Sequence, residues 1–167
     1  MTLRRVSLTV FILLFALCVA YAAWCYPQLP AKGACHFGPS GKPDAWSTKT
    51  FFVTGYLAVT AINALLFLGI SVMMPGIPVS LINLPNKSYW LAEERKRSTF
   101  DIIFRYLLWF ASATMLLLLD MFHQSVQVNM GRAESLPHPL ISLGLYLGFT
   151  ALWCIGLLFK FGKKMKT

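Results

Sequence analysis

Residues 6–24 read VSLTVFILLFALCVAYAAW, and residues 51–74 read FFVTGYLAVTAINALLFLGISVMM. Neither stretch contains Asp, Glu, Lys or Arg. A helix needs about 20 apolar residues to cross the roughly 30 Å of hydrocarbon in a bilayer, so each stretch is long enough. Two further apolar runs follow at residues 106–119 and 140–159. Because a backbone in lipid must satisfy its own hydrogen bonds and no strand-like alternation indicates a barrel, we expect helices that span a membrane.

The composition favours the same fold class. The 167 residues are 57% hydrophobic and 13% charged, with a mean hydropathy of +0.62, whereas a typical soluble domain is about 25% charged. The connections between the apolar runs are too short to bury a core of their own. We therefore predict one all-α membrane domain over residues 1–167, an integral bundle of four transmembrane helices with spans at about residues 6–25, 51–74, 102–123 and 140–160.

The 15 basic residues, which give a net charge of +9, predict the orientation of the chain. Eleven lie before the first run, between the second and third runs or after the fourth: Arg4, Arg5, Lys87, Arg95, Lys96, Arg97, Arg105, Lys160, Lys163, Lys164 and Lys166. Four lie in the other two connections: Lys32, Lys42, Lys49 and Arg132. Basic residues are retained in the cytoplasm, so we expect both termini to be cytoplasmic.

The basic residues favour lipid over nucleic acid as the partner. The cluster from Lys160 to Lys166 follows a span and is not interleaved with stacking aromatic side chains. Such a cluster is typical of contact with anionic headgroups of the lipid bilayer. The first apolar run is longer than the core of a signal peptide, so we expect it to be retained although Ala20-Tyr21-Ala22 resembles a signal-peptidase site.

The connection at residues 26–50 carries the first distinctive pattern. Its members are His36, Phe37, Gly41, Pro43, Asp44, Trp46 and Lys49. Gly41 supplies the positive φ that a turn requires, and Trp46 suits the headgroup interface. Cys25 and Cys35 flank the start of this connection, where they either form a disulfide or remain two free thiols.

This pattern resembles the short domain near the N-terminus of SdpI-type toxin-immunity proteins and of many related small bacterial membrane proteins of unknown function. The resemblance covers about residues 26–75. It implies a protein of the bacterial inner membrane, with toxin immunity as the function of the better-known members. On this interpretation the outer loop recognises a ligand or a protein or peptide partner.

A second pattern reads INLPNKSYWL at residues 82–91 and is similar to a string that follows the second helix in a subset of those proteins. Its members are Asn83, Pro85, Asn86, Lys87, Tyr89 and Trp90. Proline breaks any helix before Asn86, and Tyr89 and Trp90 can anchor at the inner interface. Two interpretations remain open, an amphipathic lead-in to the third span and a docking site for a cytoplasmic partner.

The expected third span, at about residues 102–123, holds ionisable residues at membrane depth. Asp120 and His123 are three residues apart near its outer end, and such residues are candidate functional sites. We expect a structural hydrogen bond between them, or a pair with Lys49 or Arg132. In the resembling proteins the third helix often ends in a His followed by an Asn, positions that His123 and Asn129 match loosely.

A metal site on the outer side is a further hypothesis. Its candidate ligands are His36, Asp120, His123 and His138, which suit Zn(II) or copper. No Cys-x-x-Cys, His-x-x-x-His or Glu-x-x-His spacing is present in the sequence, and we predict no cofactor.

Two further features of the sequence, a lone amide and a glycine pattern, predict how the helices pack. Asn63 is a lone amide in the second run and is expected to form a hydrogen bond across a helix interface. Gly144 and Gly148 form a Gly-x-x-x-Gly pattern in the fourth run, which we expect to pack against the first or second helix.

The sequence lacks the common enzyme signatures, including a phosphate-binding Gly-rich loop, Gly-x-Ser-x-Gly and His-Glu-x-x-His. Two functional interpretations remain. One is a non-enzymatic four-helix membrane protein whose outer loop meets a ligand. The other is an accessory or catalytic subunit of a membrane complex, metal-assisted at its outer face through Asp120, His123 and His36.

Overall fold

The computed structural model of this chain describes residues 2–162. Four of its helices are long and apolar enough to cross a membrane: α1 (Thr2–Cys25), α2 (Lys49–Met73), α4 (Glu93–Asn129) and α5 (Pro139–Gly162). A hairpin of β1 (Lys32–Phe37) and β2 (Pro43–Thr48) joins α1 to α2, and the short helix α3 (Lys87–Trp90) precedes α4. Three 3₁₀ turns complete the described elements: η1 (Tyr26–Gln28), η2 (Met74–Gly76) and η3 (Val79–Leu81).

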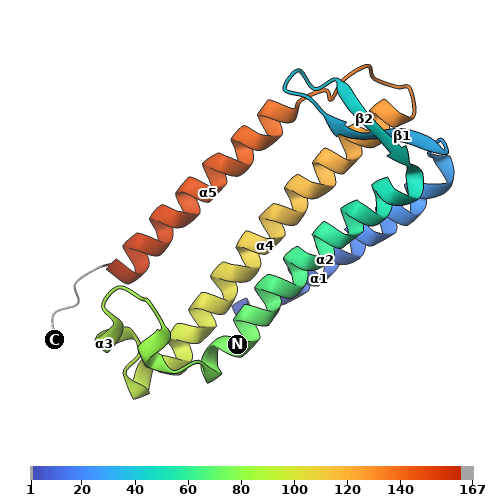
Figure 1. Cartoon of the computed structure of the whole chain (residues 1–167). Coiled ribbons are helices and arrows are strands. Elements are labelled where there is room, and N and C mark those ends of the chain that lie inside the picture. The colour runs from blue at the N-terminus through green and yellow to red at the C-terminus, as the bar shows by residue number, and fades with distance from the viewer. Residues whose placement is uncertain (1, 163–167) are drawn as a thin grey trace.

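The prediction of an all-α membrane bundle is confirmed, and the chain is a multi-pass membrane protein. The start of α1 and the end of α5 lie at one end of the bundle, and the β-hairpin lies at the other (Figure 1). Lys163, Lys164 and Lys166 of the basic C-terminal cluster lie outside the described residues.

Helix α4 is much longer than the span expected at residues 102–123. Its 37 residues extend about 55 Å at 1.5 Å per residue, well beyond the hydrocarbon of a bilayer. At its start, Glu93 and Glu94 complement the positive end of the helix dipole. At its other end the helix continues beyond residue 123, and Gln124 and Val126 in this extension are buried.

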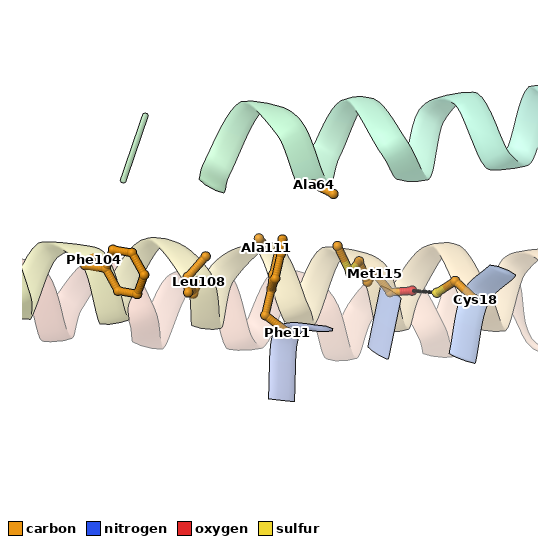
Figure 2. Packing of buried hydrophobic residues seen from close by; sticks show 7 residues of the cluster. All are labelled: Phe11, Cys18, Ala64, Phe104, Leu108, Ala111 and Met115. Atoms are coloured by element: carbon orange, nitrogen blue, oxygen red, sulfur yellow. Dashed lines mark hydrogen bonds between the residues drawn. The ribbon is translucent and has the colours of Figure 1, made fainter. Parts of the chain in front are cut away.

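The core lies where α1 and α2 pack against α4. Figure 2 shows the buried side chains of this cluster, which are Phe11, Cys18, Ala64, Phe104, Leu108, Ala111 and Met115. Lipid tails are as apolar as these side chains, so membrane helices associate through close packing and hydrogen bonds. The small side chains of Ala64 and Ala111 allow a close approach, and Asn63 Nδ2 donates to the carbonyl of Ala111 at 3.2 Å. The predicted cross-helix hydrogen bond of Asn63 is therefore confirmed.

Helix α5 lies on the far side of α4 from α1 and α2, and its main contacts are with α4 (Figure 1). Trp153 Nε1 donates to the carbonyl of Tyr106 at 3.1 Å, and the hydroxyls of Thr114 and Tyr146 lie 3.0 Å apart. Large side chains therefore make this interface.

The expected packing of Gly144 and Gly148 against α1 or α2 is wrong. A Cβ built on either glycine would meet nothing within 4 Å. The reason is that α5 turns its aromatic side, with Tyr146 and Trp153, toward α4. The two glycines therefore lie on an open face of the helix.

The INLPNKSYWL segment fastens the end of α5. The carbonyl of Phe161 accepts hydrogen bonds from Asn86 Nδ2 at 2.8 Å and from Trp90 Nε1 at 3.3 Å. The last carbonyls of a helix have no partners within the helix, so these donors act as a cap. The rings of Trp90 and Phe161 meet edge to face with centroids 5.1 Å apart, and Phe161 is only 2% exposed.

The other members of this segment shape the connection or remain exposed. Lys87 Nζ donates to the carbonyl of Ser80 at 3.0 Å, and the ring of Tyr89 lies under the Arg95 guanidinium at 4.2 Å. Asn83 and Pro85 are exposed. Within this segment, α3 ends shortly before α4 begins. The lead-in to the third span and the docking site for a cytoplasmic partner both stay predictions.

We predict that removing either donor to Phe161 loosens the last turn of α5. Asn86→Gly preserves the backbone conformation, since Asn86 has a φ of 51°, which glycine adopts freely. Trp90→Phe removes the N–H donor but preserves an aromatic ring. Each lost hydrogen bond is worth about 1 kcal/mol, so amide hydrogen exchange in this turn should quicken about fivefold. Exchange is measured by mass spectrometry in detergent.

Tyr89→Phe is the matched control for the α5 cap, because it removes a polar group of the same segment that does not touch Phe161. It should leave the exchange unchanged. Unchanged exchange in both Asn86→Gly and Trp90→Phe would contradict the assignment of a cap.

Candidate functional site

The connection at residues 26–50 forms a structured hairpin. β1 and β2 pair antiparallel, with Lys32 opposite Thr48 and Phe37 opposite Pro43. The turn closes where Gly38 N donates to the carbonyl of Lys42 at 2.9 Å, and Gly41 has the predicted positive φ, at 75°. The two strands escaped the sequence analysis because register shifts between Ala34 and Phe37 interrupt the alternation that marks a strand.

Asn129, at the end of α4, holds the hairpin by its backbone. Ala34 N donates to Asn129 Oδ1 at 2.5 Å, and Asn129 Nδ2 donates to the carbonyl of Ala34 at 3.0 Å. The side-chain amide thus pairs with the strand as a neighbouring strand would. A Cβ added to Gly33 would lie 2.5 Å from Asn129 Oδ1, so any other residue here would displace the Asn129 amide.

Two further backbone contacts fix the hairpin. Leu136 N, in the connection between α4 and α5, donates to the carbonyl of Gly41 at 2.9 Å. Lys49 N, at the start of α2, donates to the carbonyl of Ala31 at 3.0 Å. The hairpin is therefore tied to α2, to α4 and to the connection between α4 and α5.

The fixed hairpin presents an exposed polar and aromatic surface. His36 Nδ1 and Asp44 Oδ1 lie 2.5 Å apart across the strands, and their side chains are 69% and 50% exposed. Trp46 on β2 is 56% exposed. Even a fully charged pair at the surface contributes only about 0–1 kcal/mol to stability, so the fold does not depend on this contact. These three side chains form what we term the hairpin surface.

The remaining residues of the loop pattern support the hairpin. Phe37 and Pro43 are half-buried and face each other at the turn end. Lys49 Nζ lies 4.8 Å from the centre of the Tyr26 ring, a cation–π contact that joins the start of α2 to η1.

The expected hydrogen bond between Asp120 and His123 is not formed. Asp120 Oδ2 accepts from Ser142 Oγ at 2.6 Å, on α5, whereas His123 Nδ1 lies 2.5 Å from the hydroxyl of Tyr21, on α1. The two side chains diverge because α4 lies between α1 and α5, and each side chain meets a different neighbour. Within residues 2–162, Asp120 also forms no ion pair with Lys49 or Arg132.

Gln124, which the sequence analysis missed, organises the polar contacts between α4 and α5. Its Nε2 donates to Asp120 Oδ2 at 2.7 Å and to Ser142 Oγ at 3.0 Å, and its Oε1 accepts from His138 N at 2.8 Å. The side chain is 2% exposed. Its position one helical turn after Asp120 was the available signal, because residues four apart share a helix face.

The four candidate metal ligands do not converge. His36 contacts Asp44 on the hairpin, while His123 and Asp120 contact α1 and α5 respectively. Over the described range 2–162, no group of three or more His, Cys, Asp or Glu side chains could hold a metal ion.

The disulfide considered between Cys25 and Cys35 is not formed either. Cys25 is a buried free thiol, and Cys35 is a half-buried free thiol on β1. Cys25 instead packs in an apolar cluster with Ala22, Val53, Phe122 and Val126. The hairpin is held by hydrogen bonds without a covalent link.

We predict a strong coupling between Gly33 and Asn129. Gly33→Ala forces the amide away, and overpacking of this kind costs about 1–3 kcal/mol. Asn129→Ala removes two hydrogen bonds at about 1 kcal/mol each. When Asn129 is already Ala, Gly33→Ala should lower the free energy of unfolding by much less. The free energy of unfolding is measured in denaturing detergent.

Gly55→Ala is the matched control for the Gly33 substitution, because a Cβ at Gly55 would meet nothing within 4 Å. Gly55→Ala should change the free energy of unfolding by the same amount whether residue 129 is Asn or Ala. Additive effects of Gly33→Ala and Asn129→Ala would show that the contact between these two residues does not set the position of the hairpin.

Residues 13–61 match the protein family described as "Domain of unknown function (DUF1648)". The matched segment runs from the middle of α1 through the hairpin and into α2, and it includes every residue of the loop pattern from His36 to Lys49. No curated protein and no solved structure shows significant similarity to the chain. The hairpin, the part of α1 from residue 13 and the part of α2 up to residue 61 are thus similar to a known domain.

Proposed function

We propose that this chain is a non-enzymatic protein of the bacterial inner membrane that recognises a ligand or partner through its hairpin surface, in the manner of a toxin-immunity protein. The observation that supports this proposal most is the exposure of His36, Asp44 and Trp46 on a hairpin whose backbone is fixed at three places. These side chains contribute little to the fold and remain available to a partner.

The fixed backbone matters because binding costs free energy when a loop must first be ordered. Asn129, Leu136 and Lys49 already order this hairpin in the free chain. Exposed tryptophan is among the side chains that dominate binding energies at interfaces, and the carboxylate and imidazole beside it can supply polar contacts. The hairpin surface therefore suits recognition of a peptide or protein.

We predict that a bacterium expressing this chain alone survives a membrane-active peptide toxin that kills the parent strain. Asp44→Ala and Trp46→Ala should each abolish protection, because each removes a contact group, while leaving the protein level unchanged. Survival is counted as colonies at graded toxin doses, and protein level is measured by immunoblotting of membranes.

Trp24→Ala is the matched control for Trp46, since Trp24 is exposed at the same end of the bundle but lies on α1. It should preserve protection. Full protection by both Asp44→Ala and Trp46→Ala would rule out the hairpin surface as the recognition site.

The proposal includes an orientation with both termini in the cytoplasm and the hairpin outside. Arg4, Arg97 and Lys160 lie toward the end of the bundle opposite the hairpin (Figure 1). The larger group of basic residues thus gathers at one end, and such a group is retained in the cytoplasm.

We predict that a cysteine at position 42 reacts with a membrane-impermeant maleimide in intact spheroplasts. Lys42→Cys is made with Cys35→Ser, so that the native thiol of the hairpin does not react, and Lys42 is exposed. Glu94→Cys, exposed at the other end of the bundle, should react only after lysis. The reverse pattern would invert the proposed orientation.

The second interpretation, an accessory subunit of a membrane complex, is favoured by one observation. The open face of α5 at Gly144 and Gly148 would allow another helix to approach closely. The metal-assisted form of this interpretation loses its basis, because its candidate ligands lie apart. A parental chain that gives no protection in the toxin assay would make the accessory role the better account.

A further inference from the structure

A groove opens between α1 and α5 in the half of the bundle that holds the start of α1 and the end of α5. It has a volume of about 520 Å³, and α4 forms its floor. It exists because α5 packs chiefly against α4, which leaves α1 and α5 apart (Figure 1). Its volume lies within the range of about 300–1,000 Å³ that is usual for small-ligand sites.

The groove contains two cations and no carboxylate. Arg105 and Lys160 line it, and no Asp or Glu does. Arg105 Nε donates to the backbone carbonyl of Asp101 at 3.2 Å, while the Asp101 carboxylate is paired with Arg4 at 2.6 Å. Within the part of the chain that the structure describes, neither Arg105 nor Lys160 forms an ion pair.

Unpaired cations beside hydrocarbon attract an anion strongly, because the low dielectric of the surroundings raises the interaction energy. Lys160 Nζ lies 5.6 Å from the centre of the Trp90 ring, a weak contact that leaves its positive charge without a counterion. The groove therefore favours a ligand with a negative charge where Arg105 and Lys160 lie.

The rest of the groove is apolar and aromatic. Trp109, Phe149 and Trp153 line it together with Tyr106. Trp153 is fixed by its hydrogen bond to the carbonyl of Tyr106, and Trp109 is 44% exposed. A hydrocarbon chain can lie along these rings and remain continuous with the bilayer.

We propose that this groove binds one anionic phospholipid, with the phosphate between Arg105 and Lys160 and an acyl chain along Trp109 and Trp153. Basic pockets between membrane helices are suited to anionic headgroups, and here the aromatic wall matches the acyl chain. The site lies at the opposite end of the bundle from the hairpin surface and does not depend on the recognition role of that surface.

The test is quenching of tryptophan fluorescence by lipids that carry bromine on an acyl chain. The full chain is reconstituted in phosphatidylcholine vesicles that contain increasing fractions of brominated phosphatidylglycerol or, separately, brominated phosphatidylcholine. Half-maximal quenching should require an about tenfold lower fraction of the anionic lipid. Trp109→Phe should remove much of this preferential component, whereas Trp46→Phe should retain it.

Paired substitutions identify the headgroup site. Arg105→Gln with Lys160→Gln should abolish the preference for the anionic lipid, and Arg105→Lys with Lys160→Arg should keep it, since both charges remain. Lys96→Gln with Arg97→Gln is the matched control, because it removes two cations near the same end that do not line this groove.

Two outcomes would overturn the proposal. One is equal quenching of the parental chain by the two brominated lipids, as expected when both lipids exchange freely around the bundle or when another protein occupies the groove. The other is a preference that persists in Arg105→Gln with Lys160→Gln. Circular dichroism of each variant confirms that the helices are retained before quenching is compared.

Discussion

The packing of three helices against α4 is the contact on which the rest of the structure depends. Burial of apolar surface does not drive helices together in lipid, so small side chains and hydrogen bonds must hold them. Asn63 on α2 and Cys18 on α1 both donate to backbone carbonyls of α4, while Thr114 and Asp120 on α4 contact hydroxyls of α5. Helix α4 is thus the scaffold of the bundle.

The length of α4 links this scaffold to the hairpin. The helix continues past the expected end of its span to Asn129, whose side-chain amide pairs with the backbone of Ala34. A helix that ended at the membrane surface would leave the hairpin without this support. The hairpin is consequently tied to the bundle by hydrogen bonds, although it lies in a connection rich in glycine and proline.

Helix α5 is held differently from α1 and α2. It is fastened at one end through Ser142 and Gln124 and at the other by Asn86 and Trp90, with aromatic contacts between. Because it flanks α4 without filling the space beside α1, it leaves a groove along one side and an open glycine face along another. The two ends of the molecule thereby carry separate surfaces, one on the hairpin and one within the bundle.

The number of membrane helices, the turn at Gly41 and the polar contact of Asn63 could be predicted from the sequence, because hydropathy, positive φ and a lone amide are local properties. The contacts of Asp120 and His123 with different helices, and the open space beside Gly144, depend on how the helices pack and could not be predicted from the sequence. Neighbours of a membrane helix depend on how side-chain shapes and hydrogen bonds fit across interfaces, since lipid is as apolar as most of the helix surface. That fit cannot be read along a single chain.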